Sequence, residues 1–396
     1  MTIESEPVLG GGRRFEELEG LRAWLSWSVV GWHIIQYTAL NAHFRILGSA
    51  AGVAHAAVEI FMILSGFVIT HLLLIKQEPY RQYITRRVFR LFPLYLVMAT
   101  AGIFTTGLAA HAITELPWSG DPGFEYRDIL LGTFASQQAW FPAHLMLHLT
   151  LMQGVVPDNV LPYSSATLIG PAWSLSLEWQ FYLIAPLLVG ALRRPKWAPV
   201  AVLIVLLGYW AAGAGLFGVY RLESSFPTAG IFFLTGIASR LGYTSVRALV
   251  PSPLAVAVVS LVAAAMLPTM LSIGLWIAFY AFLVTSDRAH KGIDRPFARL
   301  WERMFGSPAA RWFGGRSYGV YLAHWPILQL TLFLVHGKLG PNLLLDAAIL
   351  LSIVVPATLL VSEMLHRGVE RPMIRLGGRV SAAMATPSAQ AARVTA

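Results

Sequence analysis

The sequence predicts an all-α fold, a polytopic transmembrane helix bundle of about ten spans with both termini in the cytoplasm. Of the 396 residues, 56% are hydrophobic and only 12% are charged, about half the charged fraction of an ordinary soluble domain. The mean hydropathy is +0.62, and apolar stretches long enough to cross a hydrocarbon core of about 30 Å recur along the chain. These observations favour membrane-spanning helices over a soluble domain.

Ten apolar stretches are expected to be spans, and they form one domain without an internal repeat. They are residues 23–42, 51–75, 91–110, 172–192, 198–216, 226–240, 252–268, 270–285, 317–336 and 343–366. The longest connecting segment, 111–171, contains an apolar run at 143–155 that is too short to span. We expect this run to lie in the membrane interface or to form a re-entrant loop.

The distribution of basic residues predicts the orientation of the bundle. The formal net charge is +9, which in a soluble protein would be compatible with nucleic-acid binding. Here all but four of the 29 Lys and Arg residues lie in the termini or in alternate connections between the expected spans, the four being Arg45, Arg127, Arg221 and Lys338. Basic residues accumulate on the cytoplasmic side. We therefore expect a multi-pass protein of the bacterial cytoplasmic membrane and no nucleic-acid partner.

The chain ends and the composition set further limits. Residues 1–22 lack a small-residue cleavage site and are expected to form a cytoplasmic segment before an uncleaved signal anchor. The membrane domain is expected to cover 23–376, and the Ala-, Ser- and Thr-rich residues 377–396 to form a disordered cytoplasmic tail. The sequence has no Cys, which excludes disulfides, thiolate nucleophiles and cysteine metal sites. We expect no metal site.

Ionisable side chains inside spans are costly, so each is a candidate site residue. Arg22 and His33 are eleven positions apart, about three helical turns, and therefore lie on nearly the same helix face. With Arg22 at the inner surface, His33 lies near the middle of the membrane. The residues alone leave two interpretations open, a general base or an imidazole that only hydrogen-bonds a neighbouring helix.

Glu59, in the second expected span, lies at a depth similar to that of His33 by helical rise. A carboxylate beside an imidazole would fix its tautomer and stabilise the imidazolium, as in a general-base pair. The alternative is a hydrogen bond that only locks two helices together. Ser65 and Gly66 fit a close helix contact better than a nucleophilic site.

Arg86, Arg87 and Arg90 are expected to cluster on one helix face at the cytoplasmic edge of the membrane. Guanidinium groups bind phosphate through paired hydrogen bonds, so the cluster is a candidate site for a nucleotide-like donor. Arginines that anchor a helix to lipid headgroups are common at this edge, and without further context that interpretation is favoured.

Glu178, in the fourth expected span, shares a helix face with Ser174 and Tyr182, which lie four residues on either side. A carboxylate at this depth must be protonated, paired or exposed to a wet cavity. Trp173 and Trp179 fit either an interfacial aromatic belt or stacking against a sugar ring.

The ninth expected span places His324 about 12 Å from the cytoplasmic side. Pro326, two residues later, is expected to kink this helix.

Six segments resemble, in the same order, those of the acyltransferase 3 family of integral membrane acyltransferases. They are LEGLR…H (Leu18–His33), VEIFMILSGF (Val58–Phe67), RRVFRLFPLY (Arg86–Tyr95), WSLSLEWQFY (Trp173–Tyr182), SYGVYLAHWP (Ser317–Pro326) and HRGVERPMIRL (His366–Leu376). Each segment alone is weakly specific, but six in order are highly specific. The family usually has Asp at the positions of Glu19 and Glu59, and often a second acid at that of Trp179.

The resemblance implies a ten-span enzyme that transfers an acyl group, usually acetyl, from cytoplasmic acyl-CoA to a glycan, glycolipid or similar hydroxyl acceptor. Acyl-CoA would be a co-substrate, with no permanently bound cofactor. The family's first-span Arg and His correspond to Arg22 and His33. Its Arg-x-x-Arg corresponds to Arg87 and Arg90, and its fourth-span Glu to Glu178.

The resemblance and the residue chemistry together assign three sets of roles. The expected catalytic residues, with His33 as the general base, are His33, Glu59 and Glu178. The expected donor-binding residues are Arg22, Arg86, Arg87 and Arg90. The expected acceptor-binding residues are Trp173, Ser174, Tyr182 and His324. Direct transfer and an acyl-imidazole relay on His33 both remain open.

Partners and alternative functions follow from the same residues. Membrane lipid surrounds the bundle, and no fused hydrolase-like domain is expected after the last span. The enzyme would act alone, as a homo-oligomer, or with a separate extracytoplasmic partner. The alternative function is a transporter or flippase for a lipid-linked sugar, against which the sequence has neither repeated halves nor paired broken helices. A membrane acyltransferase that esterifies lipids or proteins fits the motif order less well.

Overall fold

The computed structural model describes residues 15–48, 50–288 and 291–384. Within these ranges every regular element is a helix, as predicted. Most of the expected cytoplasmic segment 1–22 and the last part of the expected tail lie outside the described residues. Helix α18 continues to Ala383, so the expectation of disorder is wrong for residues 377–383.

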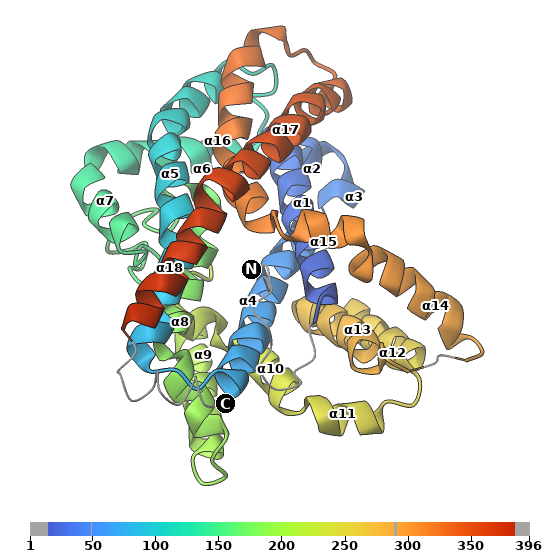
Figure 1. Ribbon diagram of the computed structural model, residues 1–396. Coiled ribbons are helices and arrows are strands. Elements are labelled where there is room, and N and C mark those ends of the chain that lie inside the picture. Colours follow the sequence, from blue (N-terminus) through green and yellow to red (C-terminus); the bar gives the residue numbers. More distant parts are fainter. Residues whose placement is uncertain (1–14, 49, 289–290, 385–396) are drawn as a thin grey trace.

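The long helices pack into a single bundle (Figure 1). The helices of the first half are α1 (Glu17–Tyr37), α2 (Leu40–His43), α3 (Arg45–Gly48), α4 (Ala50–Ile75), α5 (Tyr80–Thr114), α6 (Glu125–Ala139), α7 (Phe141–Leu149), the 3₁₀ turn η1 (Gly170–Ala172) and α8 (Trp173–Leu192).

The second half begins with shorter helices and ends with two long ones. These elements are α9 (Ala198–Gly213), α10 (Phe226–Leu241), α11 (Tyr243–Leu249), α12 (Pro253–Met266), η2 (Pro268–Met270), α13 (Leu271–Thr285), α14 (Asp294–Trp301), the π turn η3 (Glu302–Gly306), α15 (Pro308–Gly314), α16 (Ser317–Val335), η4 (His336–Lys338), α17 (Leu343–Leu365), the π turn η5 (His366–Glu370) and α18 (Arg371–Ala383). Ser252, Ser307 and Asn342 each accept a hydrogen bond from the backbone N–H three residues later, and so cap α12, α15 and α17.

Five helical segments are long and apolar enough to cross a membrane. They are Ala50–Ile75, Tyr80–Thr114, Gly170–Leu192, Ser317–Lys338 and Leu343–Ala383. Helices α11 and α12 form a sixth if this pair, bent by 102°, is one span, and α9, α10 and α13 are shorter apolar helices. The chain is an integral membrane protein. A helix coincides with each of the ten expected spans, but the count of ten and the orientation of the termini stay predictions.

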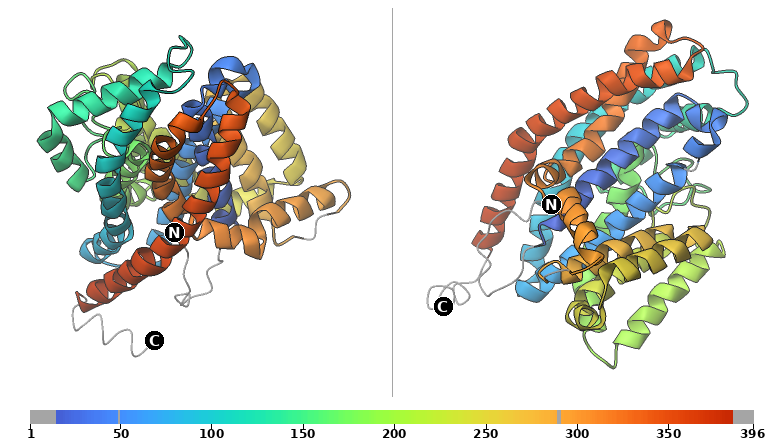
Figure 2. Two further views of the ribbon diagram at one scale, coloured as in Figure 1. Left: turned by 90° about the horizontal axis from the view of Figure 1, so that it is seen from above. Right: turned by 90° about the vertical axis from the view of Figure 1, so that its right-hand side faces the viewer.

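The C-terminal helices form a long continuous arm along one side of the bundle (Figure 2). Helix α17 packs against α16, and α18 packs against α5. Between them, η5 is a π turn that buries His366 and Glu370. Such turns insert an extra residue and re-aim side chains, often at functional sites. Here the turn places an acidic side chain in the interior of the bundle.

Helices α4 and α10 approach closely through two glycines. An added Cβ on Gly66 would lie 2.3 Å from the carbonyl oxygen of Phe233, and one on Gly236 would lie 1.9 Å from that of Ile63. Small residues let membrane helices pack with their backbones in contact. The close helix contact expected at Ser65 and Gly66 is therefore confirmed.

The apolar run 143–155 forms α7 and the turns after it. The imidazoles of His144 and His148 are buried, and the hydroxyl of Thr167 lies 3.1 Å from a ring nitrogen of each. The second ring nitrogen of His148 lies 2.8 Å from the Tyr95 hydroxyl, and that of His144 lies 3.1 Å from Ser136 Oγ. This network joins the segment 115–171 to α5.

Gly236→Ala is expected to destabilise the protein by about 1–3 kcal/mol, because the new methyl group overlaps the backbone of α4. Thermal unfolding of the detergent-purified protein measures this change. Gly190→Ala is the matched control, since nothing lies within 4 Å of its added Cβ. Equal unfolding temperatures for the two variants would contradict the contact.

Acidification is expected to destabilise the segment around α7. Burial, with a smaller effect from the nearby His144, lowers the pKa of His148 to about 3. An unfolded His has a pKa of about 6.5, so the unfolded chain binds more protons over this interval, and stability falls as the pH drops below about 6.5. The unfolding temperature should decrease from pH 7.5 to 5.5, with a shallower decrease for His148→Gln. An identical decrease in that variant would show that other groups cause it.

Candidate active site

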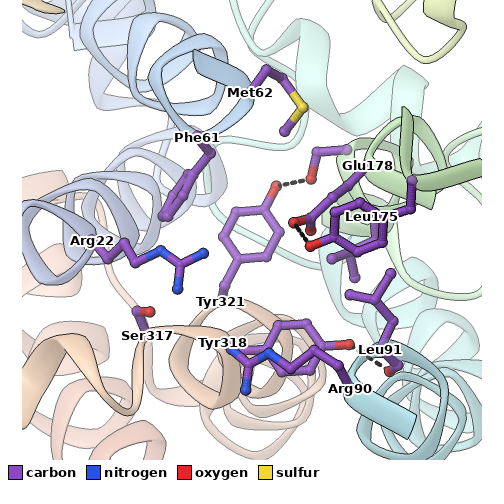
Figure 3. Close-up of a pocket in the computed structure, with 12 residues that line it drawn as sticks. Arg22, Phe61, Met62, Arg90, Leu91, Leu175, Glu178, Ser317, Tyr318 and Tyr321 are labelled. Atoms are coloured by element: carbon purple, nitrogen blue, oxygen red, sulfur yellow. Dashed lines mark hydrogen bonds between the residues drawn. The ribbon is translucent and has the colours of Figure 1, made fainter. Parts of the chain in front are cut away.

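A cavity lies where α1, α4, α5, α8 and α16 meet (Figure 3). Its apolar wall includes Phe61, Met62 and Leu175, and its polar wall includes three residues of α16. Five residues predicted from the sequence line it, namely Arg22, Arg90, Ser174, Glu178 and Tyr182. The structure thus brings together residues that directly precede the first and third expected spans and residues within the fourth.

Arg22 extends from α1 into this cavity (Figure 3). Its Nε is buried and has no hydrogen-bond partner. No hydrogen bond or ion pair connects its guanidinium to another described residue. A cation held in a bundle interior without an acid is costly. Arg22 is therefore suited to bind an anionic or strongly polar ligand.

Arg90 also lines the cavity, but its charge is compensated. The guanidinium is buried and forms an ion pair with the Glu370 carboxylate from η5. It also lies 5.3 Å from the centre of the Tyr318 ring. The other carboxylate oxygen of Glu370 lies 2.8 Å from His366 Nδ1. Arg90 thus joins α5 to the C-terminal arm.

Arg86 and Arg87 point to different surroundings. The Nε of Arg86 donates to Ser381 Oγ at 3.1 Å and lies 3.4 Å from a Glu78 oxygen. The guanidinium of Arg87 lies between aromatic rings, 5.8 Å from Tyr83 and 5.7 Å from Tyr182, and its Nε is buried without a partner. The three arginines therefore do not form one group, because Arg86 and Arg90 contact the C-terminal arm whereas Arg87 faces α8.

Glu178 projects into the cavity from α8 (Figure 3). Its Oε1 accepts hydrogen bonds from the hydroxyls of Tyr182 and of Ser65, the latter at 3.3 Å. The predicted Glu178–Tyr182 proximity is therefore confirmed. On the same helix, Ser174 Oγ lies 2.8 Å from the hydroxyl of Tyr321.

His33 and His324 lie together beyond Tyr321. Their rings stack with centres 5.4 Å apart and an angle of 20°. The ring of His324 also contacts that of Tyr321, with centres 6.1 Å apart. Neither imidazole lines the cavity, but Tyr321, which does, connects it to the pair through His324.

The hydrogen bonds of the two imidazoles define their tautomers. His33 Nδ1 lies 2.8 Å from Gln36 Oε1, and His324 Nδ1 lies 3.0 Å from the Val320 carbonyl oxygen. Both partners are acceptors, so each Nδ1 carries the proton and each Nε2 keeps its lone pair. His324 is fully buried, and its Nε2 has no hydrogen-bond partner. The arrangement provides two bases side by side.

The structure does not form the expected pair of His33 and Glu59. The carboxylate of Glu59 lies 3.3 Å from His55 Nε2, and Glu223 lies 3.6 Å from the same nitrogen. The depth of Glu59 was predicted from helical rise, but rise alone does not determine which face a side chain occupies.

Trp173 and Trp179, for which an interfacial belt and sugar stacking both stay predictions, are buried. Trp179 packs edge-on against Phe92, with ring centres 5.1 Å apart. Neither of them lines the cavity.

Sequence reasoning missed Tyr318 and Tyr321. They precede His324 at three-residue intervals in SYGVYLAH, the spacing of one helix face. It also missed Gln36 and Glu370. Glu370 lies in the closing motif HRGVERPMIRL, but nothing local identifies its partner Arg90, which is 280 positions away.

Comparison with known proteins identifies the family of this chain. A family model described as an acyltransferase domain matches residues 15–363. The peptidoglycan O-acetyltransferase OatA of Listeria monocytogenes is 26% identical over 395 residues, covering 91% of this chain and 56% of that protein. The YrhL protein of Bacillus subtilis is 25% identical, covering 79% of this chain and 48% of that protein.

A third relative is the acyltransferase MdmB of Streptomyces mycarofaciens, which is 28% identical over 54% of this chain and 48% of its own length. The chain spans about half the length of these relatives. No solved structure matches it. Because the family model covers nearly the whole membrane domain, together with the ordered motifs and the helical bundle, the chain belongs to the acyltransferase 3 family.

Proposed function

We propose that this chain is a membrane O-acyltransferase that moves an acyl group, acetyl in the first instance, from acyl-CoA to a hydroxyl of a cell-envelope glycan or glycolipid. The observation that carries the proposal is the stacked pair of His33 and His324 beside a cavity that contains the uncompensated cation of Arg22. The name of the Listeria relative supports acetyl as the acyl group and a glycan as the acceptor.

The donor would occupy the cavity with its anionic part near the free arginines. Arg22 and Arg87 have guanidinium groups without an acidic partner among the described residues, and guanidinium binds phosphate well. Arg90 would shape the cavity rather than neutralise the donor, because Glu370 already compensates its charge. With both termini in the cytoplasm, this end of the cavity faces cytoplasmic acyl-CoA.

The thioester end of the donor would lie beside the histidine pair. His33 Nε2 removes the proton of the acceptor hydroxyl as the oxygen attacks the thioester carbonyl. A C–O bond forms and the C–S bond breaks. The proton passes from His33 to the departing sulfur, which leaves as CoA thiol. The stacked His324 would hold the His33 ring in place and offer a second lone pair to the acceptor.

Glu178 would orient a substrate. Its Oε1 already accepts two hydrogen bonds, from Tyr182 and Ser65, so its Oε2 is the oxygen that can accept from a substrate O–H or N–H. Ser174 and Tyr182 complete this wall of the cavity. Glu59 is not part of it, and a catalytic role for Glu59 stays a prediction.

The rival function, a transporter or flippase for a lipid-linked sugar, has no support from the matched family or from the named relatives. The two functions differ in what they require of the donor. An acyltransferase must bind acyl-CoA and release CoA thiol, whereas a sugar transporter needs neither step.

His33→Ala is expected to lower acyl transfer by about 10²–10⁴-fold, because a positioned base contributes that much to the rate. A strain lacking the gene, complemented with wild type or variant, provides the test. Mass spectrometry of its envelope glycans and glycolipids measures the loss of one acyl unit. Immunoblotting of membranes verifies that the variant is inserted.

His43→Ala is the matched control, since His43 is exposed and paired with Asp121 away from the cavity. His33→Ala combined with His324→Ala should be no worse than His33→Ala alone, as expected for residues that act as a unit. Full acylation in the His33→Ala strain would disprove the assignment.

Arg22→Gln should weaken acetyl-CoA binding about tenfold or more, the effect of one charge-assisted hydrogen bond, with little change in stability. Arg90→Gln should instead destabilise the protein by about 3–5 kcal/mol, because Glu370 is left buried and unpaired. Isothermal titration with acetyl-CoA and thermal unfolding separate the two effects. Wild-type affinity in Arg22→Gln would remove Arg22 from the donor site.

A further inference from the structure

Helices α5 and α16 end side by side, and their ends bring together His111, Glu115 and His336. Nε2 of His111 lies 3.5 Å from one carboxylate oxygen of Glu115, and Nε2 of His336 lies 3.0 Å from the other. One donor atom from each of the three residues lies within 4.8 Å of the others. The group is separate from the cavity that contains Arg22.

The tautomer of His336 indicates what lies between its Nε2 and the Glu115 carboxylate. Its Nδ1 lies 2.6 Å from the Phe333 carbonyl oxygen, which can only accept. The Nδ1 therefore carries the ring proton, and in neutral imidazole the Nε2 lone pair faces the Glu115 oxygen at 3.0 Å. Two lone pairs at this distance repel each other unless a cation lies between them. That cation is either a second proton on His336 or a metal ion.

The surroundings favour a metal ion. A tetrahedral zinc site has bonds of about 2.0–2.1 Å to nitrogen and oxygen, which separates neighbouring donors by about 3.3 Å. The contacts of His111 and His336, each with a different oxygen of Glu115, are close to this separation. Histidines that bind metal usually donate their other ring N–H to a carbonyl oxygen, as His336 does. Both helices point their carboxyl ends, which carry partial negative charge, at the group.

The framework beneath the group is held in place. The hydroxyl of Thr105 on α5 donates to Gln329 Oε1 on α16 at 2.7 Å, in a buried contact. The two helix ends are therefore fixed relative to each other before any ligand binds. His336 is 21% exposed and His111 is 58% exposed, so an ion has access from solvent.

We propose that His111, Glu115 and His336 form a binding site for Zn²⁺, with a fourth position open to water. This departs from the expectation of no metal site, which rested on the absence of Cys. The site would link the end of α5 to the end of the helix that carries Tyr321 and His324. It does not depend on the proposed acyl transfer.

The test uses the full chain, purified in detergent with an affinity tag free of histidine, stripped with EDTA and dialysed. Isothermal titration and equilibrium dialysis with ZnCl₂ alone should give one saturable equivalent per chain. His336→Gln and Glu115→Gln should each weaken binding more than tenfold, because even the loss of a residue that only orients a metal ligand weakens affinity about 10–100-fold. Binding should also weaken at pH 5.5, because the ligands must lose their protons.

His55→Gln is the matched control, because His55, Glu59 and Glu223 form the other His and carboxylate group of this kind in the described chain. It should bind zinc like wild type, and unfolding temperatures without zinc should be equal in all variants. The proposal is overturned by no saturable uptake, by unchanged uptake in His336→Gln, or by loss only in His55→Gln. Absence of uptake would mean that a proton alone holds His336 against Glu115.

Discussion

The cost of a charge inside an apolar bundle is the constraint on which this structure depends. The buried pair of Arg90 and Glu370 illustrates it. Neither group is tolerable alone at that depth, and together they join the third long helix to the C-terminal arm. The π turn η5 exists at the point where Glu370 must face inward. Tyr318 covers the same guanidinium with its ring, so a cavity-lining helix is positioned by this pair as well.

The same constraint separates structural charges from those available to a ligand. Arg86 and Arg90 have partners on the C-terminal arm and hold helices together. Arg22 and Arg87 carry the same group but lack an acid among the described residues, and both reach the cavity or its wall. The amino-acid composition cannot show which arginines are paired and which are available to a ligand. That depends on which helix each guanidinium group contacts.

The sequence predicted those features that depend on one helix at a time. Apolar stretches located the helices, and four-residue spacing placed Ser174, Glu178 and Tyr182 on one face of α8, which lines the cavity. The sequence-based predictions were wrong where a contact depends on how two helices are rotated about their axes relative to each other. Glu59 lies on a different face of its helix from the one expected, and so it meets His55 rather than His33. The Glu370 partner of Arg90 required knowledge of how the last helix crosses the bundle.

The hydrogen-bond acceptors of His33 and His324 affect how the site can handle a proton. Each of the two imidazoles donates its Nδ1–H to a neutral oxygen, that of Gln36 or of Val320, rather than to a carboxylate. No ion pair must therefore be broken before a base acts, and no carboxylate holds the proton once it has been taken. In a low-dielectric site, an imidazolium at His33 without a carboxylate partner would be poorly stabilised. In the proposed reaction, transfer of the proton to the departing sulfur would remove that charge and so favour completion of the reaction.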